Sequence, residues 1–414
     1  MRTVILKDAY DTLVKRIEKI KKDIRLNSKE IGRAAELGDL SENAEYDAAK
    51  EKQSELFSTL NNLETYLKAR LIEEKDINTE VVSFGTRVKL FDMNRHKVVS
   101  YVVAGPVEFE LEIYPSIVTF TSPLGQGLIG KKKGQVVDIE LPNQTSRFLI
   151  LNIEPVTEEG PTHPDLLILG HAGYDVSDSG SSEKKNLLGG PAYYTGVGAS
   201  SLSDRTAIIT SIKKDHDELY KALNNLSVFV DGINLSDDED SFSITDIPSE
   251  YHNAKYLHIS EAPPDKQLQW LKDVKKGGNF EGLLSIQISD SFSKEHIYIL
   301  AEILQHCDFI FTSEDGFKLM EEMDDLEIED KVIVVIKSDA STELWIDGEL
   351  QLDAKGFDSD SVDSTGYKGV LAGAFLAVLS MGQVEETAYD VAVQLGSKSL
   401  EDDGVEHLLK VKED

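Results

Sequence analysis

Two acidic residues that stand three positions apart offer the first candidate chemistry in this sequence. Asp39 and Glu42 lie in the polar segment GDLSEN at residues 38–43. Carboxylates are oxygen ligands of the kind that Mg²⁺ takes, but one or two exposed carboxylates hold this ion only weakly. A role in magnesium chemistry would therefore require that a partner molecule supply the remaining ligands.

The same two residues also fit a purely structural role. Asp39 and Glu42 have the spacing of a helix N-cap and of an acid at the third helical position, where side chains accept hydrogen bonds from free backbone amides. Acids at these positions also favour the positive end of the helix dipole. The spacing alone leaves both interpretations open.

Two apolar stripes flank this segment and predict two long helices. The first stripe spans residues 8–37 with alternating three- and four-residue steps, and Asn27 is its polar member. The apolar members are Tyr10, Leu13, Ile17, Ile20, Ile24, Ile31 and Ala34 in the first stripe, and Tyr46, Ala49, Leu56, Leu60, Leu63 and Leu67 in the second. Because a tight turn joins the two stripes, we expect an antiparallel coiled-coil hairpin over residues 1–77, with Asp39 and Glu42 at its tip.

The next part of the chain, residues 78–156, reads as a small β-rich domain. Short runs rich in β-branched and aromatic residues alternate with Gly, Pro and Asn turns, which predicts a mostly antiparallel sheet. The runs are 82–91, 97–105, 116–122, 135–142 and 146–154. Three prolines and a glycine in EPVTEEGPTHPD then predict a linker at 157–164.

Residues 165–414 alternate between β-like and helix-like segments. The β-like runs are 166–170, 206–210, 227–232, 255–260, 283–288, 308–312 and 331–337, and clear helical stretches are 265–276 and 293–307. This alternation predicts an α/β domain with a mostly parallel sheet covered by helices. The apolar run 370–381 is shorter than the roughly 20 residues of a membrane helix, so we expect a buried core helix there and no membrane association.

Length and charge limit the classes of function. A chain of 414 residues is too long for one ordinary domain, and a net charge of −32 argues against a general nucleic-acid-binding surface. Residues 1–160 contain 23 Lys and Arg against 26 Asp and Glu, a net of −3, which leaves −29 for residues 161–414. The acidic runs at 236–240 and 321–330 are expected to be solvated surface.

The cellular setting follows from cysteine use and from the N-terminal residues. Cys307 is the only cysteine, so no intramolecular disulfide forms and a reducing compartment is expected. The first 16 residues, MRTVILKDAYDTLVKR, lack the apolar run and small-residue cleavage site of a secretory signal. We therefore expect a cytoplasmic protein.

The front third of the chain resembles a known family. GDLSENAEYDAAKEKQ at 38–53 resembles the signature of the Gre transcript cleavage factors of bacterial RNA polymerase, and TSPLGQGLIGKKKGQVVDIELP at 121–142 resembles a segment of their FKBP-like C-terminal domain. The resemblance covers residues 1–156. It implies that the hairpin enters the secondary channel of RNA polymerase while an FKBP-like domain at 78–156 docks at the channel rim.

The resemblance also implies a role for the two acids. The tip acids of the Gre factors map onto Asp39 and Glu42, which would help to hold the second Mg²⁺ of the polymerase active centre near the 3′ end of the nascent RNA. The protein would then be an accessory factor that stimulates the polymerase's own cleavage of backtracked RNA. Lys29, Arg33 and the run 131–133 are candidate contacts to RNA or polymerase, although lysine runs at domain edges also serve solubility.

The remainder of the chain resembles the ribokinase-like (PfkB) carbohydrate kinases over about residues 165–400. LLILGHAGYD at 166–175 is similar to the first strand of that family, and GGPAYYTGVGASSL at 189–202 to its Gly-Gly substrate segment. The resemblance implies that Asp175, Gly189 and Gly190 form a sugar or nucleoside pocket for a small ligand. An inherited scaffold, in which these glycines serve only a turn, is the alternative.

The sequence departs from the kinase pattern at three places. Gly366-Tyr367-Lys368-Gly369 stands where the family has G-A-G-D, so Gly369 replaces the catalytic acid. Ser313 and Gly316 replace the two named residues of the N-x-x-E element, and the nucleotide loop at 336–341 has lost its glycines. Loss of the general base alone costs about 10²–10⁴ in rate. We therefore expect this domain to lack kinase activity and to be regulatory.

Two further hypotheses remain open at this stage. The chain could be a carbohydrate or nucleoside kinase that carries a polymerase-docking module, or a ligand-sensing protein that occupies the secondary channel without stimulating cleavage. Gly369 argues against the first hypothesis because such an enzyme needs an acid there. Asp39 and Glu42 argue against a pure blocker of the channel.

Overall fold

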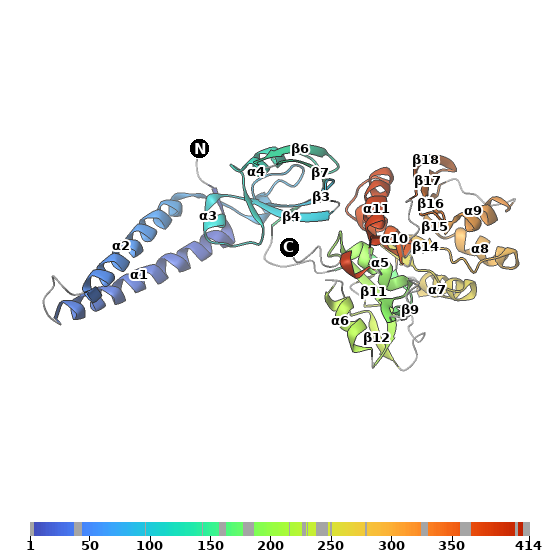
Figure 1. Cartoon of the computed structure of the whole chain (residues 1–414), viewed down its shortest axis with the longest axis horizontal. Helices are drawn as coiled ribbons and strands as arrows, with labels where there is room; N and C mark the ends of the chain where they lie inside the picture. Colours follow the sequence, from blue (N-terminus) through green and yellow to red (C-terminus); the bar gives the residue numbers. More distant parts are fainter. Residues whose placement is uncertain are drawn as a thin grey trace. The chain divides into compact units, whose positions relative to one another are not determined.

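The fold is taken from a computed structural model of the whole chain (Figure 1). It describes residues 4–36, 44–95, 97–142, 144–156, 163–176, 186–214, 216–225, 229, 231–236, 247–248, 251–277, 280–323, 330–356, 366–401 and 405–408. The chain divides into two compact units. Unit 1 comprises residues 1–94 and 99–158, and unit 2 comprises residues 95–98 and 159–414.

Two antiparallel helices form the first part of unit 1. Helix α1 spans Lys7–Glu36 and helix α2 spans Ala44–Thr65. Ion pairs between Lys21 and Glu64 at 2.7 Å and between Lys52 and Glu30 at 3.3 Å show that the two helices run in opposite directions. The predicted helices are confirmed, except that α2 ends before Leu67, which lies in the 3₁₀ turn η1 (Tyr66–Lys68). The coiled-coil description stays a prediction.

A small parallel pair of strands closes the base of these helices. Strand β1 (Val4–Leu6) precedes α1 directly, and strand β2 (Arg70–Ile72) follows η1. A second 3₁₀ turn, η2, spans Glu74–Asp76. Sequence reasoning does not predict these strands, because three residues are too few to show a β periodicity.

The rest of unit 1 is built on a five-stranded sheet with the order β5-β4-β3-β7-β6. Its strands are β3 (Thr86–Asp92), β4 (Lys97–Ala104), β5 (Ile117–Thr119), β6 (Val136–Leu141) and β7 (Gln144–Pro155). Strand β7 pairs antiparallel with β3 and β6, whereas β5 pairs parallel with β4. Each strand falls within or overlaps a predicted run, and the short helices α3 (Pro106–Glu110) and α4 (Pro123–Leu128) are additions. The FKBP-like description stays a prediction.

Two hydrophobic clusters hold unit 1 together. One joins the helical base to the sheet, because Leu13 and Leu63 of the helices belong to the same buried cluster as Val102 and Val107. The other lies beneath the sheet, around Leu90 and Ile150. The helices therefore rise from a base that shares its core with the β domain.

Unit 2 is built on a nine-stranded sheet with the order β12-β11-β8-β13-β14-β15-β16-β17-β18. Its strands are β8 (Leu166–Leu169), β11 (Thr206–Lys213), β12 (Ile233–Ser236), β13 (Tyr256–Ile259), β14 (Leu283–Gln287), β15 (Phe309–Ser313), β16 (Val332–Ile336), β17 (Thr342–Ile346) and β18 (Glu349–Ala354). All pairs from β12 to β16 are parallel, and β17 and β18 add an antiparallel edge. The predicted mostly parallel sheet is confirmed.

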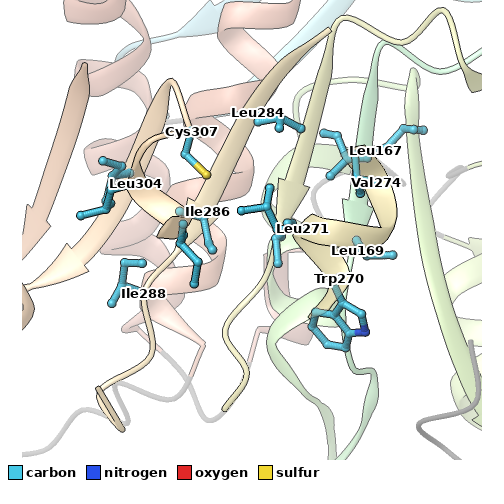
Figure 2. Packing of buried hydrophobic residues seen from close by; sticks show 14 of the residues in the cluster. Leu167, Leu169, Trp270, Leu271, Val274, Leu284, Ile286, Ile288, Leu304 and Cys307 are labelled. Carbon is cyan, nitrogen blue, oxygen red and sulfur yellow. The ribbon is translucent and has the colours of Figure 1, made fainter. Parts of the chain in front are cut away.

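Helices cover both faces of this sheet. They are α5 (Pro191–Ser200), α6 (Asp217–Asn225), α7 (Pro264–Gly277), α8 (Ile297–Leu304), α9 (Glu314–Glu321), α10 (Tyr367–Ser380) and α11 (Glu385–Ser399), with the 3₁₀ turns η5 (Lys294–His296) and η6 (Glu406–Leu408). Figure 2 shows Trp270 and Leu271 of α7 with Leu284 and Ile286 of β14 in the cluster on one face. On the other face, Phe375 of α10 stacks edge to face on Phe311 of β15.

The expected core helix in the apolar run is confirmed. Nearly every residue of α10 is buried, from Tyr367 to Ser380. Within the described ranges, no helix combines the length and the apolar character that crossing a membrane requires. Strands β9 (Gly173–Val176) and β10 (Asn186–Gly189) form a separate antiparallel pair that the sequence does not predict.

Candidate functional site

The first candidate site is the segment between α1 and α2. Asp39 and Glu42 lie outside the described residues, so their predicted role remains a prediction. The described ends of the two helices carry side chains whose charges are opposite in sign to the helix dipole at that end. Arg33 lies in the last turn of α1, and Glu45 and Asp47 lie in the first turn of α2, which matches the direction of both helix dipoles.

The basic residues that the sequence singled out are on the surface. Lys29 and Arg33 are exposed on α1, and residues 131–133 are exposed in the turn after α4. Within the described part of the chain, no group of three or more His, Cys, Asp or Glu side chains is arranged to hold a metal ion.

The base of the helices is fixed to the β domain by a buried carboxylate. Glu108 of α3 is fully buried, and its two oxygens accept hydrogen bonds from the backbone N–H of Leu6 at 2.9 Å and of Gly105 at 3.0 Å. Burial raises the pKa of Glu108 above its ordinary value of 4.5, although these hydrogen bonds favour the ionised form. The hydroxyl of Tyr114 also donates to Asp8 at the start of α1.

The second candidate site lies at the carboxyl edge of the sheet in unit 2. Strand β8 lies between β11 and β13, so the direction of the chain's progress across the sheet changes there. Ligands of open α/β sheets bind outside the carboxyl ends of the strands at such a point. Helix α5 begins at this edge, because Ala192 N–H donates to the carbonyl of His171 just after β8.

The structure brings the predicted residues Asp175, Gly189 and Gly190 together at this edge. Asp175 on β9 lies beside the end of β10, and its Oδ2 accepts a hydrogen bond from Gly190 N–H at 3.1 Å. Gly190 has φ +90°, a conformation that residues with a side chain rarely adopt, and it precedes α5 as the N-cap. A Cβ atom at Gly189 would clash with Oδ2 of Asp175, so both glycines have local structural reasons.

Tyr194 completes this group and was missed by the sequence reasoning. Its hydroxyl donates to Oδ2 of Asp175 at 2.6 Å, and the residue is buried. A Cβ atom at Gly366 would stand 2.6 Å from Cδ1 of Tyr194, and one at Gly189 would stand 2.7 Å from its hydroxyl. The side chain of Tyr194 therefore occupies the space between Asp175 and the start of α10. The sequence signal was the aromatic pair Tyr193-Tyr194 shortly after the two glycines.

The start of α10 carries a lysine that is paired internally. Gly366 is the N-cap of α10 with φ +87°, and Lys368 in the first turn donates from Nζ to Asp290, which follows β14. Burial acts to raise the pKa of Asp290, but hydrogen bonds from Lys368 and Ser313 outweigh it and hold the pKa below its ordinary value of 3.8. The cation at this helix start is thus matched by a carboxylate.

Gly369, at the position of the family's acid, is packed against α5. A Cβ atom there would stand 2.7 Å from Cβ of Tyr194 and 3.1 Å from the backbone nitrogen of Thr195. Both distances are shorter than ordinary contacts between non-bonded atoms, and the second involves backbone. This position therefore has no space for a side chain without movement of α5.

The other two altered kinase elements have local structural roles. Ser313 is the N-cap of α9 and accepts a hydrogen bond from Gly316 N–H at 3.3 Å. The segment 336–341 is the turn between β16 and β17, where Asp339 Oδ1 accepts from Ser341 N–H at 2.9 Å. This turn is closed by its own hydrogen bonds and contains no glycine.

The fold of unit 1 defines a class of protein in which two long antiparallel helices share a core with a β-rich domain, and the sequence between the helices contains the acidic segment GDLSEN. Family models for transcription elongation factors match this part of the chain: the N-terminal model matches residues 3–71, and the GreA/GreB C-terminal model matches residues 77–155. The chain belongs to the GreA/GreB family of transcription elongation factors.

Individual relatives support the family assignment. Transcription elongation factor GreA of Chloroherpeton thalassium is 37% identical over 155 residues, which cover 37% of this chain and 97% of that protein. GreA of Alkaliphilus oremlandii is 40% identical over 124 residues, which cover 30% of this chain and 77% of that protein. GreA of Borreliella burgdorferi is 39% identical over 135 residues, but this match spans only 15% of that longer protein.

Unit 2 is similar to solved structures of sugar kinases. A ribokinase from Cryptococcus neoformans in complex with ADP aligns with 61% of this chain and 99% of that chain, at 15% identity and a TM-score of 0.49. A fructokinase from Vibrio cholerae with fructose, ADP and calcium aligns with 60% of this chain and 96% of that chain, also at 15% identity and a TM-score of 0.49. The likeness is distant in both sequence and structure.

Proposed function

We propose that this protein is a transcription elongation factor that binds RNA polymerase and stimulates the polymerase's own cleavage of backtracked nascent RNA. The observation that carries the proposal is the family match over residues 3–71 and 77–155, within which both acids of the GDLSEN segment are present. A partner of this kind also implies a cytoplasmic location.

The length of α1 and α2, which together form a two-helix rod, supports a role in carrying the segment between them into a deep site. Helix α1 has 30 residues, which corresponds to about 45 Å at 1.5 Å per residue. The base of this rod shares a buried core with the β domain, so the rod is anchored at one end. Such a rod would carry Asp39 and Glu42 into a deep site while the β domain contacts the polymerase outside it.

Asp39 and Glu42 would act as ligands for a magnesium ion shared with the polymerase. Two carboxylates are a donor set that fits Mg²⁺, and the polymerase would supply the remaining ligands. When bound, the ion supplies activation of the water that hydrolyses the RNA. The part played by this chain is to place two negatively charged oxygen donors near the RNA 3′ segment without a basic surface of its own.

For unit 2 we propose a regulatory rather than a catalytic role. Position 369 has no acid and no space for one, Lys368 is paired with Asp290, and the turn at 336–341 is closed on itself. These three features support the absence of phosphoryl transfer. Oδ2 of Asp175 already accepts hydrogen bonds from Tyr194 and Gly190, so a sugar or nucleoside would have to share or displace these internal contacts to use that oxygen.

A transcript cleavage assay tests the polymerase part of the proposal. Stalled, backtracked elongation complexes are incubated with the full-length protein, and release of the RNA 3′ segment is followed over time. We expect faster cleavage than the polymerase achieves alone, and we expect Asp39→Ala and Glu42→Ala to abolish the stimulation while polymerase binding is largely retained. Absence of any stimulation by the natural protein would refute the proposal.

An ATP turnover assay tests the kinase part. The full-length protein is incubated with Mg²⁺ and ATP and with a panel of sugars and nucleosides, and ADP formation is measured. We expect no turnover above the rate without substrate. Rapid turnover with any member of the panel would favour the alternative, a carbohydrate or nucleoside kinase with a polymerase-docking module.

A further inference from the structure

The outer part of the two-helix rod contains a buried polar residue where an apolar one is expected. We define the outer half of the rod as residues 24–36 of α1 and 44–56 of α2. Asn27 is 1% exposed and lies in the seam between the helices, where the other members of its stripe are apolar. A buried polar group in such a seam lowers stability relative to an apolar residue, and its known use is to specify how the helices are aligned.

Asn27 makes directional contacts across the seam. Its Nδ2 donates to the backbone carbonyl of Ala49 at 2.8 Å and to Oε1 of Gln53 at 2.7 Å. Gln53 in turn donates from Nε2 to Oγ of Ser28 at 3.0 Å. Two residues of α1 and two of α2 are thereby linked at a single level of the rod. The Oδ1 atom of Asn27 has no hydrogen-bond partner among the described residues, so the contact is not optimised for stability.

Fewer apolar residues are fully buried between the helices around Asn27 than in the inner half of the rod. In the inner half of the rod, Leu13, Ile17 and Leu63 are all buried, and they belong to the cluster that continues into the β domain. In the outer half, Ala34 is buried, but Ile24 and Ile31 are only partly buried. Apolar contacts are not directional, so a thin apolar seam alone specifies weakly how far one helix is shifted along the other.

We propose that Asn27 fixes the stagger of α1 against α2 in the outer half of the rod and so aims the loop that carries Asp39 and Glu42. Stagger means the shift of one helix along the axis of the other. A change of one residue in stagger moves a helix end by about 1.5 Å, and one turn moves it by about 5.4 Å. Displacements of about 1 Å in a reacting group can lower a rate about 10²-fold. The inference rests on the proposed function, and Asn27 is a positioning residue that touches neither RNA nor metal.

Asn27→Leu tests this role because its effects on stability and on activity should have opposite signs. Leucine fills the seam with apolar volume. The change leaves no buried polar group without a hydrogen-bond partner. The Ala49 carbonyl can still accept a hydrogen bond within its helix, and Gln53 is only partly buried. We expect slower amide hydrogen exchange in peptides from residues 20–36 and 44–60 of the full-length protein, together with at least fivefold less stimulated cleavage. A residue needed only for folding would instead lose stability and activity together.

Crosslinking measures the stagger without polymerase. Glu30 and Lys52 form an ion pair across the rod, so cysteines at 30 and 52 report the native stagger, while pairs at 30 and 48 or 30 and 55 report shifts of about one turn. The natural Cys307 does not interfere, because burial raises the pKa of its thiol to about 12. With Asn27 present, a short bismaleimide should link mainly the 30/52 pair. In Asn27→Leu, we expect the links to spread to the displaced pairs.

Controls separate the stagger from other effects. Ile31→Leu changes a neighbouring seam residue without touching the hydrogen bonds, so its crosslinking and cleavage should match those of the natural protein. Asn27→Ala removes the hydrogen bonds without adding volume and covers the case in which leucine fails to pack. We expect it also to spread the crosslinks and lower cleavage. Polymerase affinity should stay within twofold in all variants.

The outcomes are decisive in both directions. Crosslinks confined to the 30/52 pair in both Asn27 variants would overturn the proposal, whatever the cleavage rate. Spread crosslinks with undiminished cleavage would overturn the link between stagger and aim. Failure of the proposed function would show itself differently, because the natural protein would then not stimulate cleavage even though the crosslinking result could still be obtained.

Discussion

At the scale of single residues, the second candidate site is filled by the chain's own side chains. Tyr194 donates to Asp175 and lies against Gly366, and Lys368 is neutralised by Asp290. A working phosphoryl-transfer site needs open donors at a helix start and a base beside the substrate hydroxyl. In this chain Lys368 at the helix start is occupied by its ion pair with Asp290, and position 369 is packed against α5.

Restoring the acid at position 369 should not restore a kinase. A side chain at 369 would meet Cβ of Tyr194 at 2.7 Å and the backbone nitrogen of Thr195 at 3.1 Å, so α5 and α10 would have to separate. We expect Gly369→Asp to give no ATP turnover and to lower the free energy of unfolding of unit 2 by about 1–3 kcal/mol. Both tryptophans, Trp270 and Trp345, lie in unit 2, so denaturant unfolding can be followed by their fluorescence. Measurable kinase activity in this variant would contradict the account.

At the second candidate site, the sequence predicts the missing acid but not the side chain of Tyr194 that occupies the site. The absence of an acid at Gly369 is visible from the aligned motif alone. The contact that closes the site joins residues 175, 194 and 366, and such long-range packing leaves no periodic pattern in a single sequence. Asp39 and Glu42 stay predictions, because the structure does not describe the segment in which they lie.

At the scale of elements, the position of the long rod depends on its anchorage to the β domain. Glu108 of α3 accepts hydrogen bonds from the backbone of Leu6, which directly precedes α1, and from Gly105. The base of the two long helices is thus held by the buried carboxylate of Glu108, by the hydrogen bond from Tyr114 to Asp8 and by apolar packing.

Removing this side chain should loosen the base of the rod. Glu108→Ala leaves two buried amides without their acceptor, and each unsatisfied buried amide costs about 1–3 kcal/mol. We expect the free energy of opening for residues 4–20 to fall by about 2–5 kcal/mol, as measured by amide hydrogen exchange in the full-length protein. Unchanged exchange in these residues would show that apolar packing alone fixes the base.

The rod itself should tolerate stabilisation away from its seam. Gly32 is exposed within α1, and a Cβ atom there would meet nothing within 4 Å. Glycine in a helix interior is less stable than alanine by about 0.5–1 kcal/mol. Gly32→Ala should therefore slow amide exchange in α1 by the factor that this free-energy difference corresponds to. It should leave transcript cleavage within twofold of the natural rate. A large loss of cleavage would mean that this surface contacts the polymerase.

The elements that sequence reasoning predicts well are those with sustained patterns. The stripes of α1 and α2 continue over many turns, and the strands β8, β11, β13, β14, β15 and β16 overlap predicted runs of mostly apolar residues. Strands β12, β17 and β18 were not predicted, because they mix polar and apolar residues. The helices α3 and α4 were missed because they have five and six residues, although Ser122 followed by Pro123 is a recognisable helix start. The β9 and β10 pair was missed because its strands have four residues each and no repeating pattern.

At the scale of the whole molecule, the family match ends close to the position where the net charge of the chain becomes strongly negative. The family models end at residue 155, and the net charge changes from −3 before residue 161 to −29 after it. Direct binding to free nucleic acid is disfavoured by such acidity. A factor that reaches RNA inside a polymerase needs no basic surface of this size, so the overall charge is compatible with the proposed function.

The division predicts that unit 1 is sufficient for the polymerase reaction. The family models match residues 3–71 and 77–155, and the Chloroherpeton thalassium relative is covered over 97% of its own length by an alignment of 155 residues. We expect a protein limited to residues 1–158 to stimulate cleavage within twofold of the full chain at equal concentration. A large difference in either direction would assign unit 2 a part in the reaction.

The most direct test of the account's central claim is a transcript cleavage assay with Asp39→Asn. Asparagine caps a helix about as well as aspartate, so this change retains the structural role and removes only the negative charge. Asp47→Asn, an exposed acid in the first turn of α2, is the matched control. The account predicts that Asp39→Asn loses nearly all stimulated cleavage while Asp47→Asn retains it. Full stimulation by Asp39→Asn would contradict the metal-binding role and leave capping as the function of that residue.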